Sequence, residues 1–307
     1  MKTNLKEKFL NHSNSYKFYK EQYEILSKEN QKQQNEIRLL KEEVNSLKGN
    51  DSFNSLKKLL FSKVFLTQYY NLFKESLDNV SNPRVEEKTC PICGSNAMLF
   101  LPVNRRKDAL CYNCGSFERQ RLIYLYLKRF TNIFTKENSF LHFAPEECLY
   151  NKFINSRNIN YLTGDVEKNS RVKQIIDMCN IQFEDNKFDY IMANHVLEHV
   201  PDDFQAMREL YRTVTEHSKT GGKVILTVPI FTKYDETLEK EEYNTDELRI
   251  KYYGQKDHLR AYGNDFQERL ESVGFNVKKY NVHDICSDEE IIEYGLLESD
   301  IIFECKK

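Results

Sequence analysis

Ten positions within the first fifty of this 307-residue chain, all hydrophobic except Asn30 and Gln33, recur in steps of three and four. The series runs from Tyr16 through Leu26 and Ile37 to Leu47 without an intervening proline or glycine. This spacing places the series on one stripe of a helix, and burying that stripe requires a partner helix. We predict a coiled-coil helix over residues 1–50 that pairs with a second copy of the chain. The alternative is a single helix that folds back on its own domain.

The hydrophobic pattern changes further along the chain. A second amphipathic stretch predicts a helical linker over residues 51–87. From residue 137 to the end, short apolar runs alternate with segments at helical spacing, which predicts a doubly wound parallel sheet with its ligand at the carboxyl ends of the strands. The apolar runs cover residues 140–144, 160–166, 188–194, 223–230, 277–284 and 300–306. The helical segments include residues 203–216, closed by Gly221 and Gly222, and residues 265–273, closed by Gly274.

Four of the eight cysteines form two pairs. Cys90 and Cys93 lie in "CPICG", and after seventeen intervening residues Cys111 and Cys114 lie in "CYNCG". Two residues between cysteines let both thiolates reach one ion, and the glycine after each pair permits the backbone conformation of such turns. Four thiolates favour zinc and leave no open position for a substrate. We predict a structural zinc-ribbon module and a following helix over residues 88–136; an iron–sulfur cluster or a redox pair is the alternative.

Composition favours a soluble protein, with 40% hydrophobic and 30% charged residues. The chain has no signal-peptide pattern and no apolar stretch of about 18 residues. We therefore expect a cytoplasmic protein without a transmembrane segment, in which paired cysteines bind metal rather than form disulfides.

The net charge of −2 conceals an asymmetry along the chain. Residues 1–135 hold 23 Lys and Arg against 14 Asp and Glu, a balance of +9, whereas the remainder holds 22 against 33, a balance of −11. A basic front accommodates an anionic partner such as RNA, although a solvated helix surface explains the charge equally well. The candidate phosphate contacts around the cysteine pairs are Arg105, Arg106, Lys107, Arg119 and Arg121.

Two acidic residues follow apolar runs where a nucleotide-binding sheet places its ribose ligand. Asp165 lies at the end of the second run, and Asp177 ends a further short run. A strand-terminal aspartate is also common as a turn or helix cap. The first run continues into "SFLHFAPEECLY", residues 139–150, where such domains carry glycines and this chain has none.

Residues 177–230, which include "FDYIMANHVLEHVPDDFQAMRELYRTV" and "GGKVILTVPI", resemble the central block of class I S-adenosylmethionine-dependent methyltransferases. "DHLRAYGNDFQERLESVGF" is similar to the loop and helix that follow in the group acting on small molecules, lipids and sugars. The zinc module joined to "LHFAPE" is similar to methyltransferases found with surface-polysaccharide genes. The resemblance implies a Rossmann-like methyltransferase domain over residues 137–307, with a mostly parallel sheet and an antiparallel last strand.

The resemblance also implies roles for individual residues around S-adenosylmethionine. Asp165, followed by Val166, would bind the ribose hydroxyls, and Asp177 would bind the adenine amino group. The residues flanking adenine would be Met178 and Cys179, and those at the methionine end would be Asn194 and His195. In the first motif, His142 replaces the usual acid, and Ala144, Glu146 and Cys148 occupy glycine positions. Glu146 would contact the ammonium group of the cofactor.

The segment "HVLEH", residues 195–199, also matches the H-x-x-E-H pattern of some zinc peptidases. That pattern needs both histidines on one face of a helix, and Pro201 leaves little room for such a helix. We therefore favour a role for His195 at the substrate entrance.

The favoured function is methyl transfer to a hydroxyl of a sugar or surface-glycan precursor. His195 and His258 are the candidate bases, because histidine titrates near neutral pH, and Arg260 is a candidate orienting group. An RNA acceptor is one alternative, and a non-catalytic scaffold built on the same fold is another.

Overall fold

The computed structural model describes residues 88–97, 100–103, 106–111, 113–216 and 222–307. The chain from Glu87 onward forms one compact unit. The predicted coiled-coil helix over 1–50 and the linker over 51–87 lie outside the described residues. Both therefore stay predictions, as does the pairing of two chains.

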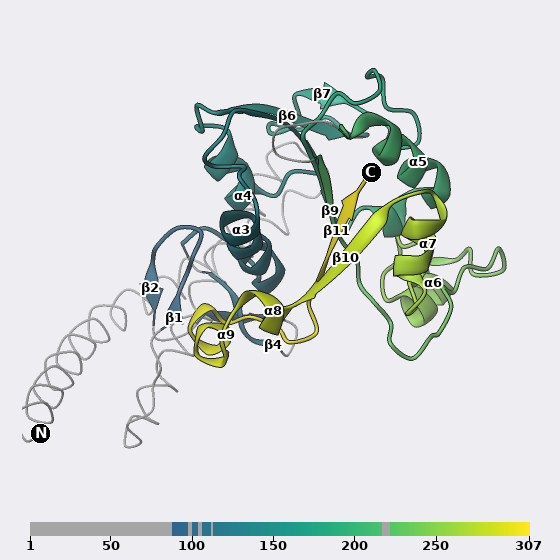
Figure 1. Cartoon of the computed structure of the whole chain (residues 1–307). Helices are drawn as coiled ribbons and strands as arrows, with labels where there is room; N and C mark the ends of the chain where they lie inside the picture. The colour runs from purple at the N-terminus through teal and green to yellow at the C-terminus, as the bar shows by residue number, and fades with distance from the viewer. Residues whose placement is uncertain (1–87, 98–99, 104–105, 112, 217–221) are drawn as a thin grey trace, which may run out of the picture. The chain divides into compact units, whose positions relative to one another are not determined.

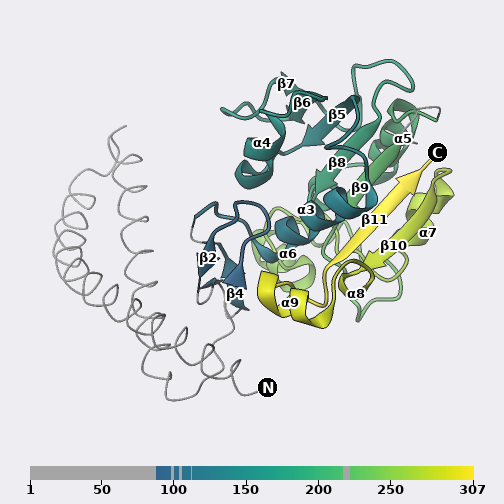
Figure 2. The same cartoon turned by 60° about the vertical axis from the view of Figure 1, so that its left-hand side comes forward.

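A seven-stranded sheet forms the centre of the described unit (Figure 1). Its strands are β5 (Asn138–Phe143), β6 (Ile159–Asp165), β7 (Gln174–Ile175), β8 (Tyr190–Asn194), β9 (Lys223–Thr227), β10 (Asn276–Asn281) and β11 (Ile301–Lys306). Their order across the sheet is β10-β11-β9-β8-β5-β6-β7, as Figure 2 shows. All pairs are parallel except those of β11, which runs antiparallel to both β9 and β10. The predicted mostly parallel sheet with an antiparallel last strand is confirmed.

The order of the strands creates a crevice at one edge of the sheet. From β5 the chain moves outward to β6 and β7, then returns to β8 on the other side of β5. The connections therefore diverge where β5 and β8 end, and ligands of doubly wound sheets bind at such a switch point. The central strands β8 and β9 are buried along their whole length, as strands covered on both faces should be.

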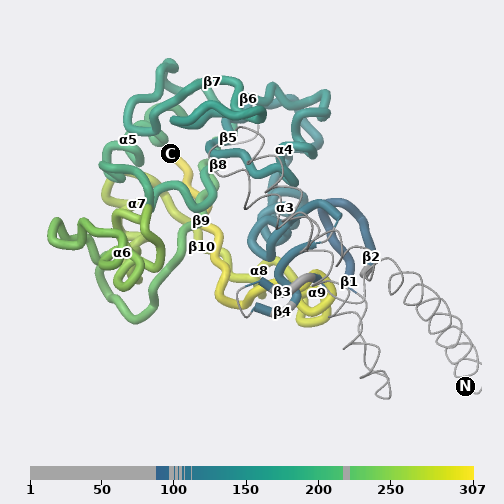
Figure 3. The backbone as a smooth tube through the Cα atoms, turned by 180° about the vertical axis from the view of Figure 1, so that it is seen from behind, coloured from purple at the N-terminus to yellow at the C-terminus, as the bar shows by residue number. Residues whose placement is uncertain are grey.

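Helices cover both faces of the sheet (Figure 3). They are α3 (Glu118–Phe130), α4 (Glu147–Phe153), α5 (Asp203–Thr213), α6 (Asp246–Tyr253), α7 (Phe266–Ser272), α8 (Val282–Ile285) and α9 (Asp288–Tyr294), with a 3₁₀ turn, η1 (Leu197–His199). Residues of α3, α4, α8 and α9 share one apolar core with Phe140 of β5. Residues of α5 and α7 share a second core with Leu141 of the same strand. Neighbouring residues of a strand point to opposite faces, so β5 supplies both cores.

The structure confirms the predicted end of one helix and contradicts the predicted end of another. Helix α7 is followed by Gly274, which has a φ of 110°, so the predicted glycine stop is confirmed. The stop predicted for the other helix at Gly221 and Gly222 is wrong. Helix α5 ends at Thr213, because Val214 is extended and bridges Phe188 beside the sheet. The consecutive β-branched residues at this point favour the extended conformation.

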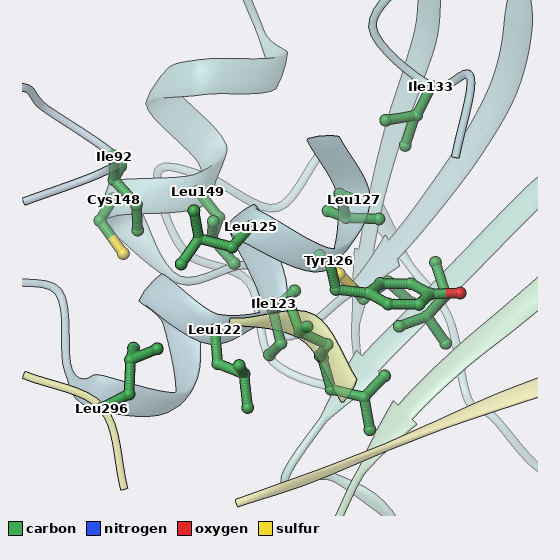
Figure 4. Packing of buried hydrophobic residues seen from close by; sticks show 14 of the residues in the cluster. Ile92, Leu122, Ile123, Leu125, Tyr126, Leu127, Ile133, Cys148, Leu149 and Leu296 are labelled. Carbon is green, nitrogen blue, oxygen red and sulfur yellow. The ribbon is translucent and has the colours of Figure 1, made fainter. Parts of the chain in front are cut away.

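The cysteine pairs precede α3 and carry short strands of their own. These are β1 (Lys88–Thr89), β2 (Asn96–Ala97), β3 (Leu101–Val103) and β4 (Arg106–Leu110), which form two antiparallel pairs. Buried residues of this module, among them Ile92, pack in the same core as Leu122 and Tyr126 of α3 and Leu149 of α4 (Figure 4). The module and the sheet are therefore held together by one continuous apolar core.

Arg121 adds polar contacts between the module and the end of the chain. Its guanidinium is fully buried and donates hydrogen bonds to five backbone carbonyls. Three belong to Asp108, Ala109 and Ser116 around the second cysteine pair, and two belong to Tyr294 and Gly295 at the end of α9. A single side chain thus fixes segments more than 170 residues apart.

In the part of the chain that the structure describes, no helix combines the length and apolar character needed to cross a membrane.

Candidate active site

A cavity of about 470 Å³ lies at the carboxyl ends of β5, β6 and β8. This volume falls within the range of roughly 300–1,000 Å³ found for small-molecule sites. Six of the ten predicted cofactor residues line it: Ala144, Asp165, Val166, Asp177, Met178 and His195. The switch point of the sheet therefore brings together residues that are far apart in the sequence.

Two lining residues have left-handed backbone conformations without being glycine. Ala144 directly follows β5 with a φ of 45°, and His195 directly follows β8 with a φ of 52°. Backbone hydrogen bonds hold both positions: Ala144 donates to the carbonyl of Gly164, and His195 donates to that of Thr227. Such conformations cost about 1–2 kcal/mol and gather at functional sites. Ala144 thus adopts the conformation for which related first motifs use glycine.

Three predicted residues form a hydrogen-bonded cluster beside the cavity. The buried ring of His142 bonds Tyr161 through Nδ1 at 2.8 Å and Glu146 through Nε2 at 3.0 Å. Asn194 donates its amide to the same Glu146 carboxylate at 3.2 Å. Burial raises the pKa of Glu146, but the hydrogen bond and charge of His142 outweigh burial and leave the pKa below its usual value. Glu146 is therefore a carboxylate at neutral pH.

The same cluster has unused hydrogen-bonding capacity. The buried Oδ1 of Asn194 has no hydrogen-bond partner among the described residues. A carbonyl oxygen next to the Glu146 carboxylate suits a group that is both positively charged and rich in N–H donors. The ammonium of S-adenosylmethionine is such a group, so these residues fit the role that the resemblance implies for them.

The other end of the cavity has acidic and apolar groups. Asp165 ends β6, and its Oδ1 accepts a hydrogen bond from the backbone of Glu167. The next residue, Val166, is 64% exposed and lines the cavity, which is unusual for a large apolar side chain. Asp177 accepts from the backbone of Cys179 through Oδ1 and has a second oxygen for a ligand. Carboxylates beside an apolar wall suit a ribose and an adenine ring.

Cys179 lies apart from these residues. Its thiol contacts the backbone carbonyl of Asp202, and it is not among the cavity-lining residues. The neighbouring Met178 is buried and lines the cavity. The structure thus brings Met178, but not Cys179, to the position that the resemblance implies for both.

The segment "HVLEH" forms a turn rather than a continuous helix. Only Leu197–His199 form a 3₁₀ turn, and Arg260 donates to the carbonyls of Leu197, Val200 and Pro201. Arg260 is fully buried, so it fixes the loop that follows β8 instead of orienting a substrate. The helix that the zinc-peptidase pattern requires is absent from residues 195–199.

His258, the second candidate base, also contacts this turn, and it does so outside both cavities. It is 3% exposed, lines neither cavity described here, and pairs Nδ1 with the carbonyl of Tyr253 at 2.8 Å. Burial lowers its pKa. Its nitrogen comes close to ligand atoms of Glu198 and His199, all within 4.8 Å of one another. This group of side chains could hold a metal ion, but it offers His258 no route to a substrate.

A second cavity, of about 230 Å³, lies on the other side of His195. Its lining includes Arg119 and Leu122 of α3, Thr227 at the end of β9, Val228 directly after it, and Asp300 before β11. His195 lines both cavities, so one titratable side chain stands where they meet. Its Nδ1 lies 3.3 Å from Oε1 of the buried Glu198.

Asp300 was not among the residues singled out from the sequence. Burial raises its pKa to about 6, and the charge of Glu118 adds to that effect, while His195, Arg119 and Arg106 act against it. No sequence signal could have found it, because Asp300 reaches the cavity only when β11 is inserted in the sheet beside β9.

The four cysteines of the two pairs come together as predicted for a metal site. Their sulfur atoms all lie within 4.8 Å of one another, with Cys90–Cys114 and Cys93–Cys111 at 3.7 Å. A tetrahedral zinc–thiolate site has sulfur atoms about 3.8 Å apart. Gly94 and Gly115 have φ values of 74° and 69°, which confirms the backbone conformation predicted after each pair. The residues present therefore fit a zinc ion.

Part of the predicted basic patch around the cysteines is engaged within the protein. Arg106 forms an ion pair with the buried Glu118 at 3.0 Å, and Arg121 is buried among carbonyls. Arg119 alone among these three lines a cavity. This arrangement gives little support to a phosphate-binding surface made by all of them.

Comparison with known proteins finds similarity in a segment that supplies part of the lining of these cavities. Residues 153–226 match a family described as a methyltransferase domain. The matched segment overlaps residues 177–230, which resemble the central block of class I methyltransferases that depend on S-adenosylmethionine, so the match agrees with the class of enzyme predicted from the sequence.

Individual relatives are more distant. The chain is 41% identical over 63 residues to phosphoethanolamine N-methyltransferase 2 of Caenorhabditis elegans, a match that covers 20% of this chain and 14% of that protein. Among solved structures, the [4+2]-cyclase SpnF is similar over 62% of this chain and 83% of its own, with 14% identity and a TM-score of 0.44. Phosphoethanolamine N-methyltransferase 2 of Haemonchus contortus, in complex with S-adenosyl-L-methionine, is similar over 63% of this chain and 53% of its own, with 14% identity and a TM-score of 0.40.

Proposed function

We propose that the protein transfers a methyl group from S-adenosylmethionine to a hydroxyl of a sugar or surface-glycan precursor. The observation that carries this proposal is the position of His195, which lines both cavities at the end of β8. The larger cavity would hold the cofactor and the smaller one the acceptor. The sulfonium of the cofactor supplies an electrophilic methyl group when it is bound.

The residues of the chain would bind and align the two reactants. Glu146 and Asn194 would hold the ammonium group, and Asp165 and Asp177 the ribose and the adenine. Methyl transfer is an in-line displacement, so alignment of the acceptor hydroxyl is the main task of the protein. His195 would orient that hydroxyl or accept its proton, since it lies where the cavities meet and has Glu198 beside it.

The four cysteines would hold a structural zinc ion. The supporting observation is the spacing of their sulfur atoms, together with serine hydroxyls of Ser95 and Ser116 at 3.0–3.4 Å from them. Hydroxyls at this distance can donate to metal-bound thiolates and so fix their orientation. Such a site is closed and takes no part in the reaction.

Binding of S-adenosylhomocysteine, the demethylated cofactor, tests the proposal by calorimetry. We expect the wild-type protein to bind it and Asp165→Ala to weaken binding about 10- to 100-fold, because two hydrogen bonds to a charged group are lost. Asp235→Ala, at an exposed position outside both cavities, should bind as the wild type does. No binding by the wild-type protein would instead support the non-catalytic scaffold.

A further inference from the structure

The second cavity contains polar atoms that the protein itself does not satisfy. Nε of Arg119, Oγ1 of Thr227 and Oδ2 of Asp300 are buried and have no hydrogen-bond partner among the described residues. Much of the remaining lining is apolar, including Leu122, Val228 and residues at the start of β11. Unpaired buried polar groups are costly, and their convergence on one cavity indicates a ligand that supplies the missing partners.

The charges in this cavity define what that ligand carries. Glu118, the acidic neighbour of Arg119, pairs with Arg106 instead, at 3.0 Å. Arg119 and Asp300 form no ion pair with each other or with another described residue. A free guanidinium suits a phosphate or a carboxylate, which it can bind through two N–H groups. A free carboxylate with a nearby threonine hydroxyl suits a ligand hydroxyl.

The size of the cavity limits the ligand. Its volume of about 230 Å³ is less than half that of the first cavity and lies below the usual range for drug-sized ligands. A single sugar-sized ring with its substituents is therefore the largest unit that fits. A long chain of bases or sugars would have to remain outside.

We propose that this cavity binds a small hydroxylated acceptor that bears a phosphate or a carboxylate. Arg119 contacts the anionic group, and Asp300 with Thr227 contacts a hydroxyl next to His195. This inference rests on the proposed function, since it assigns the smaller cavity to the acceptor, and it adds an anionic group to the acceptor.

The proposal also gives the cysteine module a part in substrate binding. Arg119 lies in the first turn of α3, five residues after the last cysteine, Cys114. Arg121 in the same turn is bonded to carbonyls around that cysteine pair and to the segment that leads towards Asp300. Arg119 and Asp300, which come from opposite ends of the described unit, are thereby positioned by one buried side chain.

Calorimetry on the full-length protein, with and without saturating S-adenosylhomocysteine, tests this proposal. The probes are glucose 6-phosphate, glucuronate, inorganic phosphate and glucose. At least one of the two anionic sugars should bind at least tenfold more tightly than glucose and than inorganic phosphate. Arg119→Met should weaken that binding about 10- to 100-fold, because a hydrogen-bonded charge is lost. The exposed Arg157→Met is the matched control and should leave it unchanged.

The outcomes separate this proposal from the proposed function. Protein that binds S-adenosylhomocysteine but neither anionic sugar overturns the acceptor assignment and leaves the cofactor site intact. Equal binding by Arg119→Met and Arg157→Met also overturns it. If Arg119→Met no longer binds S-adenosylhomocysteine, Asp300→Asn replaces it in the same comparison, with Asp235→Asn as its control. Tight binding of inorganic phosphate without binding of either anionic sugar would show that the hydroxyl contacts are absent, and it would overturn the proposal.

Discussion

Ala144 shows how one residue can support a site in a motif that lacks glycine. Its methyl group is the smallest side chain after glycine, and its φ of 45° directs the chain away from β5 at the edge of the cavity. A branched side chain at this φ would clash with the neighbouring backbone and would narrow the cavity.

The effect of a substitution at Ala144 on cofactor binding should therefore depend on the shape of the new side chain. Ala144→Val should weaken binding of S-adenosylhomocysteine at least tenfold, because a β-branched residue is strained at positive φ and occupies cavity space. Ala144→Gly should bind as the wild type does, since glycine adopts this conformation freely. Calorimetry on both variants makes the test, and equal loss in both would show that the methyl group itself is needed.

The pKa of Asp300, about 6, makes the stability of the fold depend on pH. This value lies above that of an unfolded aspartate, near 3.9. The folded protein therefore binds the proton more tightly, and ionising Asp300 destabilises the fold as the pH rises from about 4 to 6. Asp300→Asn should be more stable than the wild type by about 1–3 kcal/mol at pH 7.5, with the gain reduced to about half at pH 5.

Urea unfolding at the two pH values measures this difference. The exposed Asp235→Asn provides the control and should change stability by less than about 0.5 kcal/mol at either pH. A gain for Asp300→Asn that is independent of pH would contradict the assignment of the shifted carboxyl.

At the scale of elements, the strands were the most predictable part of the fold. Apolar runs predicted six strands of the sheet, each within two residues of an observed boundary at its start. The two-residue β7 was too short to give a periodic signal. The end of α5 was misplaced because two adjacent glycines are a strong stop signal, but the helix ends earlier, at the β-branched Thr213, and the next residue, Val214, bridges Phe188 beside the sheet.

A buried ion pair joins three elements that the sequence pattern could not connect. Glu304 of β11 accepts hydrogen bonds from Lys223 of β9 at 2.6 Å and from the hydroxyl of Tyr126 in α3. Burial raises the pKa of Glu304, but these two contacts outweigh burial and leave it below its usual value. The pair therefore stabilises the fold at neutral pH, and this contribution is lost as the pH falls through the lowered pKa.

Removing one partner of this pair should be strongly destabilising. Glu304→Gln leaves the Lys223 ammonium buried without its counter-charge, which typically costs about 3–5 kcal/mol. Urea unfolding at pH 7.5 measures the change, with the exposed Glu268→Gln as control. A loss below about 1 kcal/mol in Glu304→Gln would mean that water reaches the ammonium.

At the scale of the whole molecule, the candidate site was predicted in part. The resemblance named the acidic residues of the larger cavity: Asp165 ends a strand that can be recognised from the sequence, and Asp177 ends a further short apolar run. The smaller cavity could not be predicted, since Arg119 and Asp300 are 181 positions apart and meet only through the packing of α3 against the end of the sheet. His258 and Arg260 lie in a motif that could be recognised from the sequence, but both side chains are buried and line neither cavity.

The shared core predicts that metal loss affects the entire described unit. If the four cysteines hold zinc as proposed, removing it with a chelator, or replacing Cys111 with serine, should lower the melting temperature by about 10 °C or more and weaken cofactor binding. We expect one cooperative transition rather than two, because the module and the sheet pack in the same core. Metal content and calorimetric scanning make the measurement, and Cys179→Ser should keep its zinc. A separate early transition with cofactor binding intact would contradict this prediction.

The position of β11 determines when the protein can fold during synthesis. Strand β11 follows all other strands of the described sheet in the sequence, yet it is inserted between β9 and β10, and Arg121 finds two of its five partners only at Tyr294 and Gly295. The cysteine module is therefore synthesised more than 170 residues before the carbonyls of Tyr294 and Gly295 that complete the hydrogen bonds of its buried arginine. Nascent chains that stall before residue 294 should therefore expose both the module and the open edge of β9 to chaperones and proteases.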